Sequence, residues 1–262
     1  MKKFLPLLFL MALSLPALAQ ENDKKLSKKE ERRQRINALG RLEEEGVITH
    51  RKHFAFGAKL TTDGYGGWLE LGRAQSVKKQ LLFQLDISER KHTKEEKQQF
   101  DFSSSTPVIY GKINFFYPVK LGVQQQILLG NKGNKNGVSV TGNVGGGLSM
   151  AMLRPYLITI IDDNGDEKSI DFNSDSSGFL LGNIRRGPGF GKGWNKIKFT
   201  PGAYVKSSVR FDYGKFNEMI NALEAGIVLE YYTKEIQQMA FQKDRKLFFS
   251  GYVALVFGKR KQ

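Results

Sequence analysis

Apolar and polar positions alternate along many segments of this chain. In residues 247–258, every second position from Leu247 to Phe257 is apolar or glycine, and the positions between them include Ser250 and Tyr252. A period of two is the geometry of a β-strand. A tilted strand of this length crosses a bilayer, and aromatic residues near both ends suit the two membrane–water interfaces. An edge strand of a soluble β-protein has the same pattern, so the rest of the chain has to decide.

The same alternation predicts about ten strands. With the N-terminus in the periplasm, the even-numbered connections are short inner turns, and three of the odd-numbered connections are long outer loops. This combination is typical of bacterial outer-membrane barrels. The predicted strands are 53–60, 65–73, 79–88, 108–117, 119–129, 138–148, 153–161, 197–211, 223–232 and 247–258. The short turns are 74–78, 118, 149–152 and 212–218, and the long loops are 89–106, 162–195 and 233–246.

The polar face of these strands distinguishes a membrane barrel from a soluble one. A soluble lipocalin-like barrel points its apolar face inward. Here the face opposite the apolar one carries Lys, Arg, Glu, Asp and Gln on several strands, which is too much charge for a dry core. We therefore expect an all-β, antiparallel, up-and-down transmembrane barrel with a polar lumen. About ten strands are predicted, and eight or twelve are the alternatives.

Charged residues on two neighbouring strands predict how the lumen is filled. The hairpin near residues 215–217 makes antiparallel partners sum to about 434. This register sets Arg210 opposite Glu224 and Tyr204 opposite Glu230, with Lys206 one diagonal from Glu230. Because small barrels fill their interior with side chains, we expect ion pairs to close this lumen. The predicted lumen network is Lys198, Tyr204, Lys206, Arg210, Glu224 and Glu230.

The N-terminus predicts export through the general secretory pathway. Lys2 and Lys3 precede an apolar run that ends in Ala17-Leu18-Ala19, the pattern of a cleavable signal peptide. No later stretch of 18 apolar residues exists, so membrane insertion is expected as a barrel. The predicted organisation is a signal peptide at 1–19, a charged periplasmic segment with a short helix at 20–52, the barrel at 53–258 and a basic tail at 259–262.

The net charge predicts anionic partners. Removing Lys2 and Lys3 with the signal peptide lowers the charge from +15 to +13. In an exported protein, phosphates of outer-membrane lipid and lipopolysaccharide are more accessible than nucleic acid, and no nucleic-acid-binding motif is present. The expected lipopolysaccharide contacts are Arg185, Arg186, Lys192 and Lys196. Other cations expected on the outer side are Arg90, Lys91, Lys94, Lys97, Lys132 and Lys135.

Four sequence motifs resemble those of a known class of proteins. They are YGKINFFY (110–117), GNKGNKNGV (130–138), GGLSMAMLRPY (146–156) and the terminal GYVALVFGKRK. With the signal peptide, they resemble outer-membrane β-barrel proteins of the Bacteroidota, from about residue 50 onwards. The resemblance implies a barrel and an outer-membrane location, and it leaves the activity open. We also expect the barrel-assembly machinery, and periplasmic or surface proteins, as partners.

Patterns for catalysis or metal binding are weak. His50 and His53 have no cysteine or third ligand beside them. His92 shares a loop with three serines but no triad pattern orients it. The loop that begins at 162–166 has Glu167 where a calcium loop requires glycine, and the stretch 187–193 is preceded by Arg186 where a phosphate loop has its first glycine. We expect no enzymatic activity, no cofactor and no metal.

Two functional classes remain. The first is a structural or interaction platform in the membrane, including an assembly factor. The second is a small-solute pore or transport barrel, and an outer-membrane lipid-modifying enzyme is a third alternative. Open aqueous channels appear at about 16 strands, so a smaller barrel filled with charged and tyrosine side chains favours the platform.

Overall fold

The computed structural model describes residues 27, 29–34, 37–38, 51–76, 78–98, 107–132, 137–162, 164–214 and 218–261. The chain separates into two units, 1–38 and 39–262. The predicted signal peptide lies outside the described residues. No helix in the described part of the chain is both long enough and apolar enough to span a membrane.

The first unit contains a short helical stretch. Residues 29–34 and 37–38 are helical, as expected for part of the charged segment. Ser27 Oγ accepts a hydrogen bond from the Glu30 N–H at 3.3 Å, and Glu30 Oε2 accepts one from the Ser27 N–H at 3.0 Å. This reciprocal pair is a capping box that begins a helix after Ser27.

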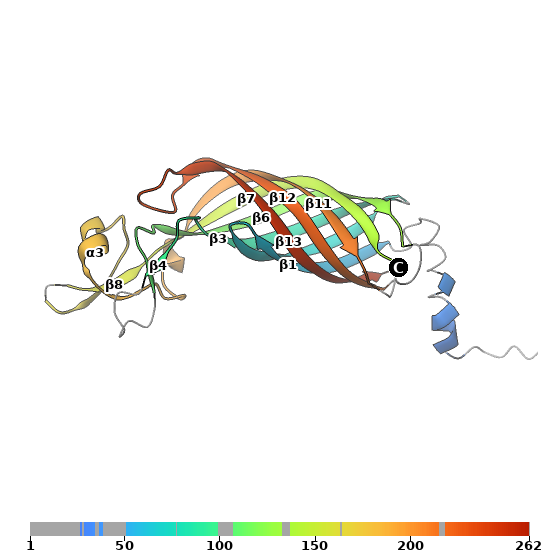
Figure 1. The fold of residues 1–262 in the computed structure, drawn as a ribbon, viewed down its shortest axis with the longest axis horizontal. Coiled ribbons are helices and arrows are strands. Elements are labelled where there is room, and N and C mark those ends of the chain that lie inside the picture. Colours follow the sequence, from blue (N-terminus) through green and yellow to red (C-terminus); the bar gives the residue numbers. More distant parts are fainter. Residues whose placement is uncertain are drawn as a thin grey trace, which may run out of the picture. The chain divides into compact units, whose positions relative to one another are not determined.

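Eight long antiparallel strands close into a barrel in the second unit (Figure 1). Strands that follow one another in the barrel are neighbours, and the last strand pairs with the first. The fold is therefore an all-β up-and-down barrel, and eight, one of the expected alternatives, is the strand number. The barrel strands are β1 (Lys52–Thr61), β2 (Gly64–Ala74), β3 (Lys79–Arg90), β6 (Asn114–Gly130), β7 (Ser139–Pro155), β11 (Lys198–Asp212), β12 (Met219–Ile236) and β13 (Arg245–Lys261).

The number ten was wrong because two expected turns lie inside strands. Pro118 lies within β6 and is paired with Ala151 of β7. On its other side, the β6–β3 ladder passes from Val119 directly to Phe116, which leaves Pro118 without a partner on β3. Proline has no N–H to donate, so this interruption lets it remain within the strand. The expected turn at 149–152 is likewise part of β7.

The barrel extends past its predicted C-terminal end. Residues 259–261, expected to form a basic tail, are the last residues of β13, and Lys261 is paired with Lys52 of β1. We call the end of the barrel where β1 begins and β13 ends the terminal rim. The opposite end, where the long connections lie, is the loop end.

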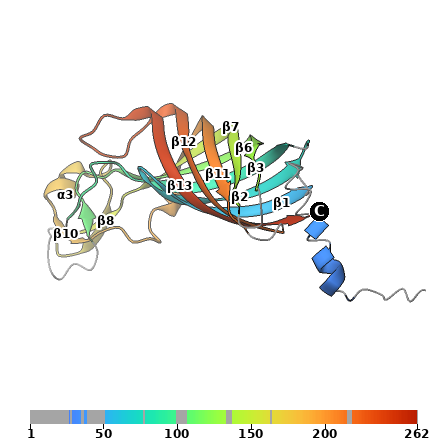
Figure 2. The same ribbon diagram turned by 45° about the vertical axis from the view of Figure 1, so that its right-hand side comes forward.

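The long connections at the loop end fold around a core of their own. We call residues 91–98, 107–113, 156–162, 164–197 and 237–244 the loop domain. It contains a three-stranded sheet in the order β10-β8-β9, with α3 beside it (Figure 2), and a two-stranded ribbon of β4 and β5. The elements are β4 (Lys97–Gln98), β5 (Val108–Ile109), β8 (Ile158–Ile161), β9 (Glu167–Ile170), α3 (Ser176–Leu181), β10 (Asn183–Arg186) and the 3₁₀ turn η1 (Trp194–Lys196).

Alternation along the strands sets the two faces of the barrel. In β1, for example, Phe54 and Phe56 are exposed while Ala55 and Lys59 are buried. The exposed apolar face occurs on all eight strands, and the buried face lines the lumen. Representative exposed residues, one or more from each strand, are Phe56, Leu69, Phe83, Leu121, Leu148, Val205, Ile227, Phe249 and Leu255.

Candidate functional site

The lumen is filled with buried charged and hydroxyl side chains from every strand. Two clusters of ion pairs occupy it, one nearer the terminal rim and one nearer the loop end. Contributors from the eight strands in chain order are Lys59, Glu70, Asp86, Lys120, Ser149, Arg210, Glu230 and Tyr252. Each of these side chains is at most 5% exposed, so the polar face of the sequence pattern is an interior surface.

Arg210 is the centre of the cluster nearer the terminal rim. Its guanidinium donates to both carboxylate oxygens of Glu70 on β2, at 2.8 Å each, and its Nε donates to Glu224 Oε2 at 2.7 Å. Lys206 lies 3.2 Å from the other oxygen of Glu224, which also accepts from the Tyr252 hydroxyl at 2.6 Å. The planar guanidinium thereby joins strands β2, β11 and β12, and it neutralises two carboxylates across the interior.

Glu230 is the centre of the cluster nearer the loop end. Its Oε1 lies 2.7 Å from Lys120 Nζ and 3.1 Å from Arg90 Nη2. Its Oε2 accepts from the Tyr232 hydroxyl at 2.6 Å. Lys59 and Asp86 form a further pair at 2.5 Å, and Lys120 lies 3.7 Å from Asp86. The cluster connects strands β1, β3, β6 and β12 through the lumen.

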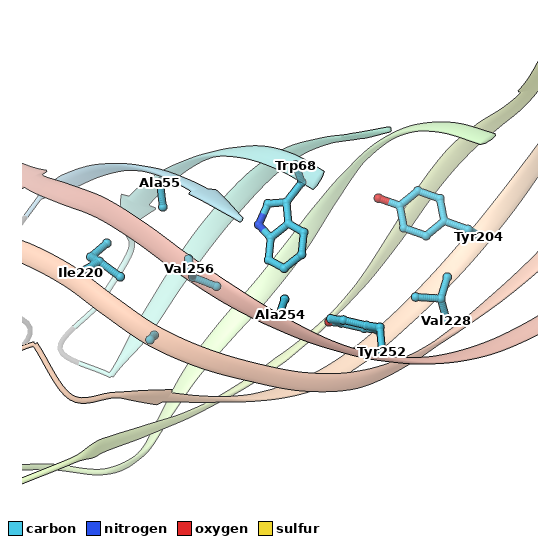
Figure 3. Packing of buried hydrophobic residues seen from close by; sticks show 9 residues of the cluster. Ala55, Trp68, Tyr204, Ile220, Val228, Tyr252, Ala254 and Val256 are labelled. Carbon is cyan, nitrogen blue, oxygen red and sulfur yellow. The ribbon is translucent and has the colours of Figure 1, made fainter. Parts of the chain in front are cut away.

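Aromatic side chains occupy the lumen as well (Figure 3). The rings of Trp68 and Tyr252 meet edge to face, with centroids 6.2 Å apart. The Lys206 ammonium lies over both rings, at 4.5 Å from Trp68 and 4.9 Å from Tyr252. Gly57, the register partner of Trp68, has no side chain, and a Cβ there would meet the indole at 2.5 Å. These contacts fill this part of the interior with side chains.

The predicted register between β11 and β12 is the one observed. Arg210 is paired with Glu224, and Tyr204 is paired with Glu230. Lys206, expected beside Glu230, instead forms its ion pair with Glu224, because Glu230 is held by Lys120 and Arg90.

Lys198 does not belong to the lumen network. It has the inward parity of β11, but it is the first residue of the strand, at the loop end, and it is exposed. The barrel wall does not enclose a side chain at this position, whereas Thr200, two residues later, is buried. The prediction for Lys198 was therefore wrong.

Several network members were missed in the sequence. Glu70 and Lys59 were not singled out, and Arg90 was assigned to an outer loop, although each follows the alternation of its strand. Asp86 and Lys120 belong to the charged face that the alternation predicted, but no partner was predicted for either. Alternation could have found all five, but pairing them requires knowledge of which strands face each other across the closed barrel.

A cavity opens at the terminal rim. It measures about 720 Å³, a volume that includes open solvent. Its lining includes His53, Lys132, Arg210, Asp212 and Arg260. Asp212 forms an ion pair with Arg260 and lies 3.6 Å from Lys132 Nζ. Because Arg210 belongs to the rim-side cluster, the cavity reaches the ion-pair network at this end of the lumen.

The loop domain is fastened by buried polar contacts. The Ile109 N–H donates to the Tyr156 hydroxyl at 2.8 Å, and burial raises the pKa of that hydroxyl to about 12. Lys112 Nζ lies 2.6 Å from Glu95, and burial lowers the pKa of this lysine despite the ion pair. The apolar core beside them comes from all three long connections. It comprises Val108, Ile109, Tyr156, Ile158, Ile160, Ile170, Phe179 and Met239.

Arg154 holds one loop segment against the barrel wall. Its guanidinium lies 4.3 Å from the ring centroid of Phe115 and 5.0 Å from that of Trp194. It also donates to the carbonyls of Phe190 and Lys192, at 2.7 and 3.2 Å. Aromatic and carbonyl partners together hold residues 190–194 beside the part of β7 that lies at the loop end.

The four expected lipopolysaccharide contacts all lie in the loop domain. Arg185 and Arg186 are exposed in β10, and Lys192 and Lys196 are exposed in or next to η1. Two strongly exposed apolar residues lie near them in sequence: Leu181, at 87%, precedes Arg185, and Phe190, at 80%, lies between Arg186 and Lys192.

Some other cations lie elsewhere than expected. Arg90 lies in the lumen and not on the outer surface. Lys132 lies at the terminal rim, where it donates to the Gly214 carbonyl at 2.6 Å. The sequence placed Lys132 at the outer end because it divided β6 into two strands. Since β6 is one strand, the 131–138 connection lies at the terminal rim. Lys135 lies outside the described residues.

The structure adds no support to the catalytic and metal-binding alternatives. No group of three His, Cys, Asp or Glu side chains suited to a metal occurs in the described ranges. His50 and Ser103–Ser105 lie outside them. His53, inside the barrel, lies 3.1 Å from Glu70, so it belongs to the rim-side cluster.

Comparison with known proteins gives similarity at the level of the barrel. No family model matches the chain, and no curated protein matches it. Among solved structures, the N-terminal β-barrel domain of Pseudomonas aeruginosa OprF is similar over 80% of this chain and 99% of its own, with 11% identity and a TM-score of 0.35. Ail, the attachment invasion locus protein of Yersinia pestis, is similar over 80% of this chain and 96% of its own, with 10% identity and a TM-score of 0.35.

Proposed function

We propose that this chain spans the bacterial outer membrane as a barrel with a closed lumen and acts as a platform that presents the loop domain at the cell surface. The observation that carries the proposal is the pair of faces described above. The outward face is apolar on all eight strands, and the inward face is a network of buried charges. In water, an exposed apolar surface of this extent is rare, whereas lipid requires it.

Closure of the lumen favours the platform over the pore. An eight-stranded barrel has room for side chains but not for an open channel. Arg210 and Glu230 each connect several strands through this interior, so a solute would have to break buried ion pairs to pass. The loop domain supplies the platform itself, because its own apolar core gives it a defined surface.

We further propose lipopolysaccharide as one partner of the loop domain. Arg185, Arg186, Lys192 and Lys196 offer charge to phosphates, and Leu181 and Phe190 are apolar residues among them. Each exposed contact is weak and screened by salt, so binding has to be collective.

Two measurements test this function. Unboiled protein in detergent is expected to migrate faster on a denaturing gel than boiled protein, and to be recovered with outer membranes. Identical migration together with recovery in the soluble periplasmic fraction contradicts the membrane barrel.

For the partner, replacing Arg185, Arg186, Lys192 and Lys196 by glutamine should weaken lipopolysaccharide binding. A control that neutralises Arg51, Lys78 and Lys79, exposed cations near the terminal rim, should leave most of it. Equal loss in both variants contradicts a role for the loop domain.

A further inference from the structure

Three cations lie side by side on the outer face of the terminal rim. Lys52 of β1 is the register partner of Arg73 on β2 and of Lys261 on β13. All three are exposed and have the outward parity of their strands. Directly opposite residues of antiparallel strands have Cα atoms about 5 Å apart, so the Cα atoms of these three cationic residues lie within about 10 Å. Like charges placed in this way destabilise a sheet.

No ion pair neutralises these charges among the residues that the structure describes. In the described part of the chain, none of Lys52, Arg73 and Lys261 forms an ion pair. The neighbouring Arg260, which has the inward parity, is paired with Asp212. The described strands therefore provide an acid for the inward cation and none for the outward row.

The charged row borders a specific part of the apolar face. Two residues further along β1, Phe54 is the next residue on the outer face. It is paired with Leu71 on β2 and with Lys259 on β13, and Lys259 is a fourth cation beside the three. One row further, Phe56 is paired with Phe257, and their ring centroids are 5.8 Å apart. The arrangement is a group of cations at the edge of an aromatic and aliphatic surface.

Among the residues that the structure describes, this arrangement lies on one side of the barrel, where the exposed Lys79 at the start of β3 continues it. The exposed residues at the same rim on or next to β6, β7 and β11 include the apolar and aromatic side chains of Leu129, Val138, Phe211 and Tyr213. A charged belt that served only to mark the interface would not be expected on one sector alone.

We propose that the β13–β1–β2 sector of the terminal rim binds an anionic phospholipid. Lys52, Arg73 and Lys261 hold the headgroup phosphate, and an acyl chain lies against Phe54, Phe56 and Phe257. Basic clusters beside a membrane-spanning segment attract anionic headgroups. The bound phosphate supplies the negative charge that the sheet lacks. The inference rests on the proposed membrane-spanning function and places the lipid in the leaflet at the terminal rim.

The test compares protein reconstituted in nanodiscs of phosphatidylcholine with protein in nanodiscs that also contain phosphatidylglycerol. Thermal unfolding and lipid retention in native mass spectrometry are the readouts. Phosphatidylglycerol should raise the unfolding midpoint of the wild type and be retained with it. Replacing Lys52, Arg73 and Lys261 by glutamine should abolish both effects. In phosphatidylcholine alone, the same variant should melt above the wild type because the repulsion is gone.

Matched variants separate this site from general charge effects. Replacing Lys234, Arg245 and Lys246 by glutamine removes the same charges from exposed positions at the loop end and should leave the phosphatidylglycerol effect intact. The double change Lys52→Arg and Lys261→Arg should also keep it.

Several results would overturn the site. They are an undiminished effect in the rim variant, an equal loss in the loop-end variant, or the full effect produced by inorganic phosphate in phosphatidylcholine discs. Failure of the wild type to enter any bilayer contradicts the membrane-spanning function instead, so the two failures are distinguishable.

Discussion

Arg210 on β11 donates to both carboxylate oxygens of Glu70 on β2, 140 residues away in the chain, at 2.8 Å each. The two strands are not neighbours in the barrel, since β11 pairs with β7 and β12. The contact therefore crosses the lumen. This link between β2 and β11 is therefore a property of the folded barrel and not of any one hairpin.

Arg210→Ala should be strongly destabilising. It leaves Glu70 and Glu224 buried without their guanidinium, and removal of one partner of a buried ion pair costs about 3–5 kcal/mol. Lys192→Ala, at an exposed loop position, should cost far less. Urea unfolding from detergent or lipid measures the loss of stability in both variants.

The double change Arg210→Ala with Glu224→Ala should cost less stability than the sum of the single changes. Strict additivity would show that the two side chains do not interact.

Tyr156→Phe should loosen the loop domain and spare the barrel. The change removes the acceptor of the buried Ile109 N–H, at a cost of about 1–3 kcal/mol. Amide hydrogen exchange is expected to speed up around residues 107–113 and 156–161, with no change in β11 to β13. Tyr110→Phe, at an exposed position of the same segment, is the control. Faster exchange throughout the barrel would contradict a separately fastened loop domain.

Acidification should loosen the turn at His92. Burial, with the nearby Arg245 charge, lowers the pKa of His92 from its ordinary 6.5. Its Nδ1 accepts from the Lys94 N–H at 3.2 Å, which requires that nitrogen to be unprotonated. Because the folded pKa lies below the unfolded one, the stabilisation is present above about pH 6.5 and is lost as the pH falls through the folded value. In the wild type, hydrogen exchange of the Lys94 amide should show this opening as the pH falls, and in His92→Gln it should not. An opening that persists in the variant would assign it to another group.

The strand faces could be predicted from the sequence because alternation is a local property. The inward positions of Arg210 and Glu224 and their register follow from one hairpin. Pro118 was read as a turn because the sequence does not show that the β3 ladder is interrupted opposite it.

The loop domain and the cross-lumen contacts could not be predicted in this way. Residues 158–161 are apolar and alternate, but they pack into the core of the loop domain and not into the barrel wall. A local pattern does not say which of two cores a strand joins. Contacts such as Glu70 with Arg210 depend on how the sheet closes, which sets the strands that face each other.

Conductance in planar bilayers tests the central claim most directly. The claim is that Arg210, Glu230 and their partners close the lumen of a barrel that spans the membrane. Purified wild-type protein, shown to be inserted by its heat-dependent gel migration, should give no resolved current steps. The double change Glu70→Ala with Arg210→Ala, which removes two members of the rim-side cluster, is the comparison and should raise the current fluctuations. Reproducible conductance steps from the inserted wild type would contradict the closed lumen and favour the pore.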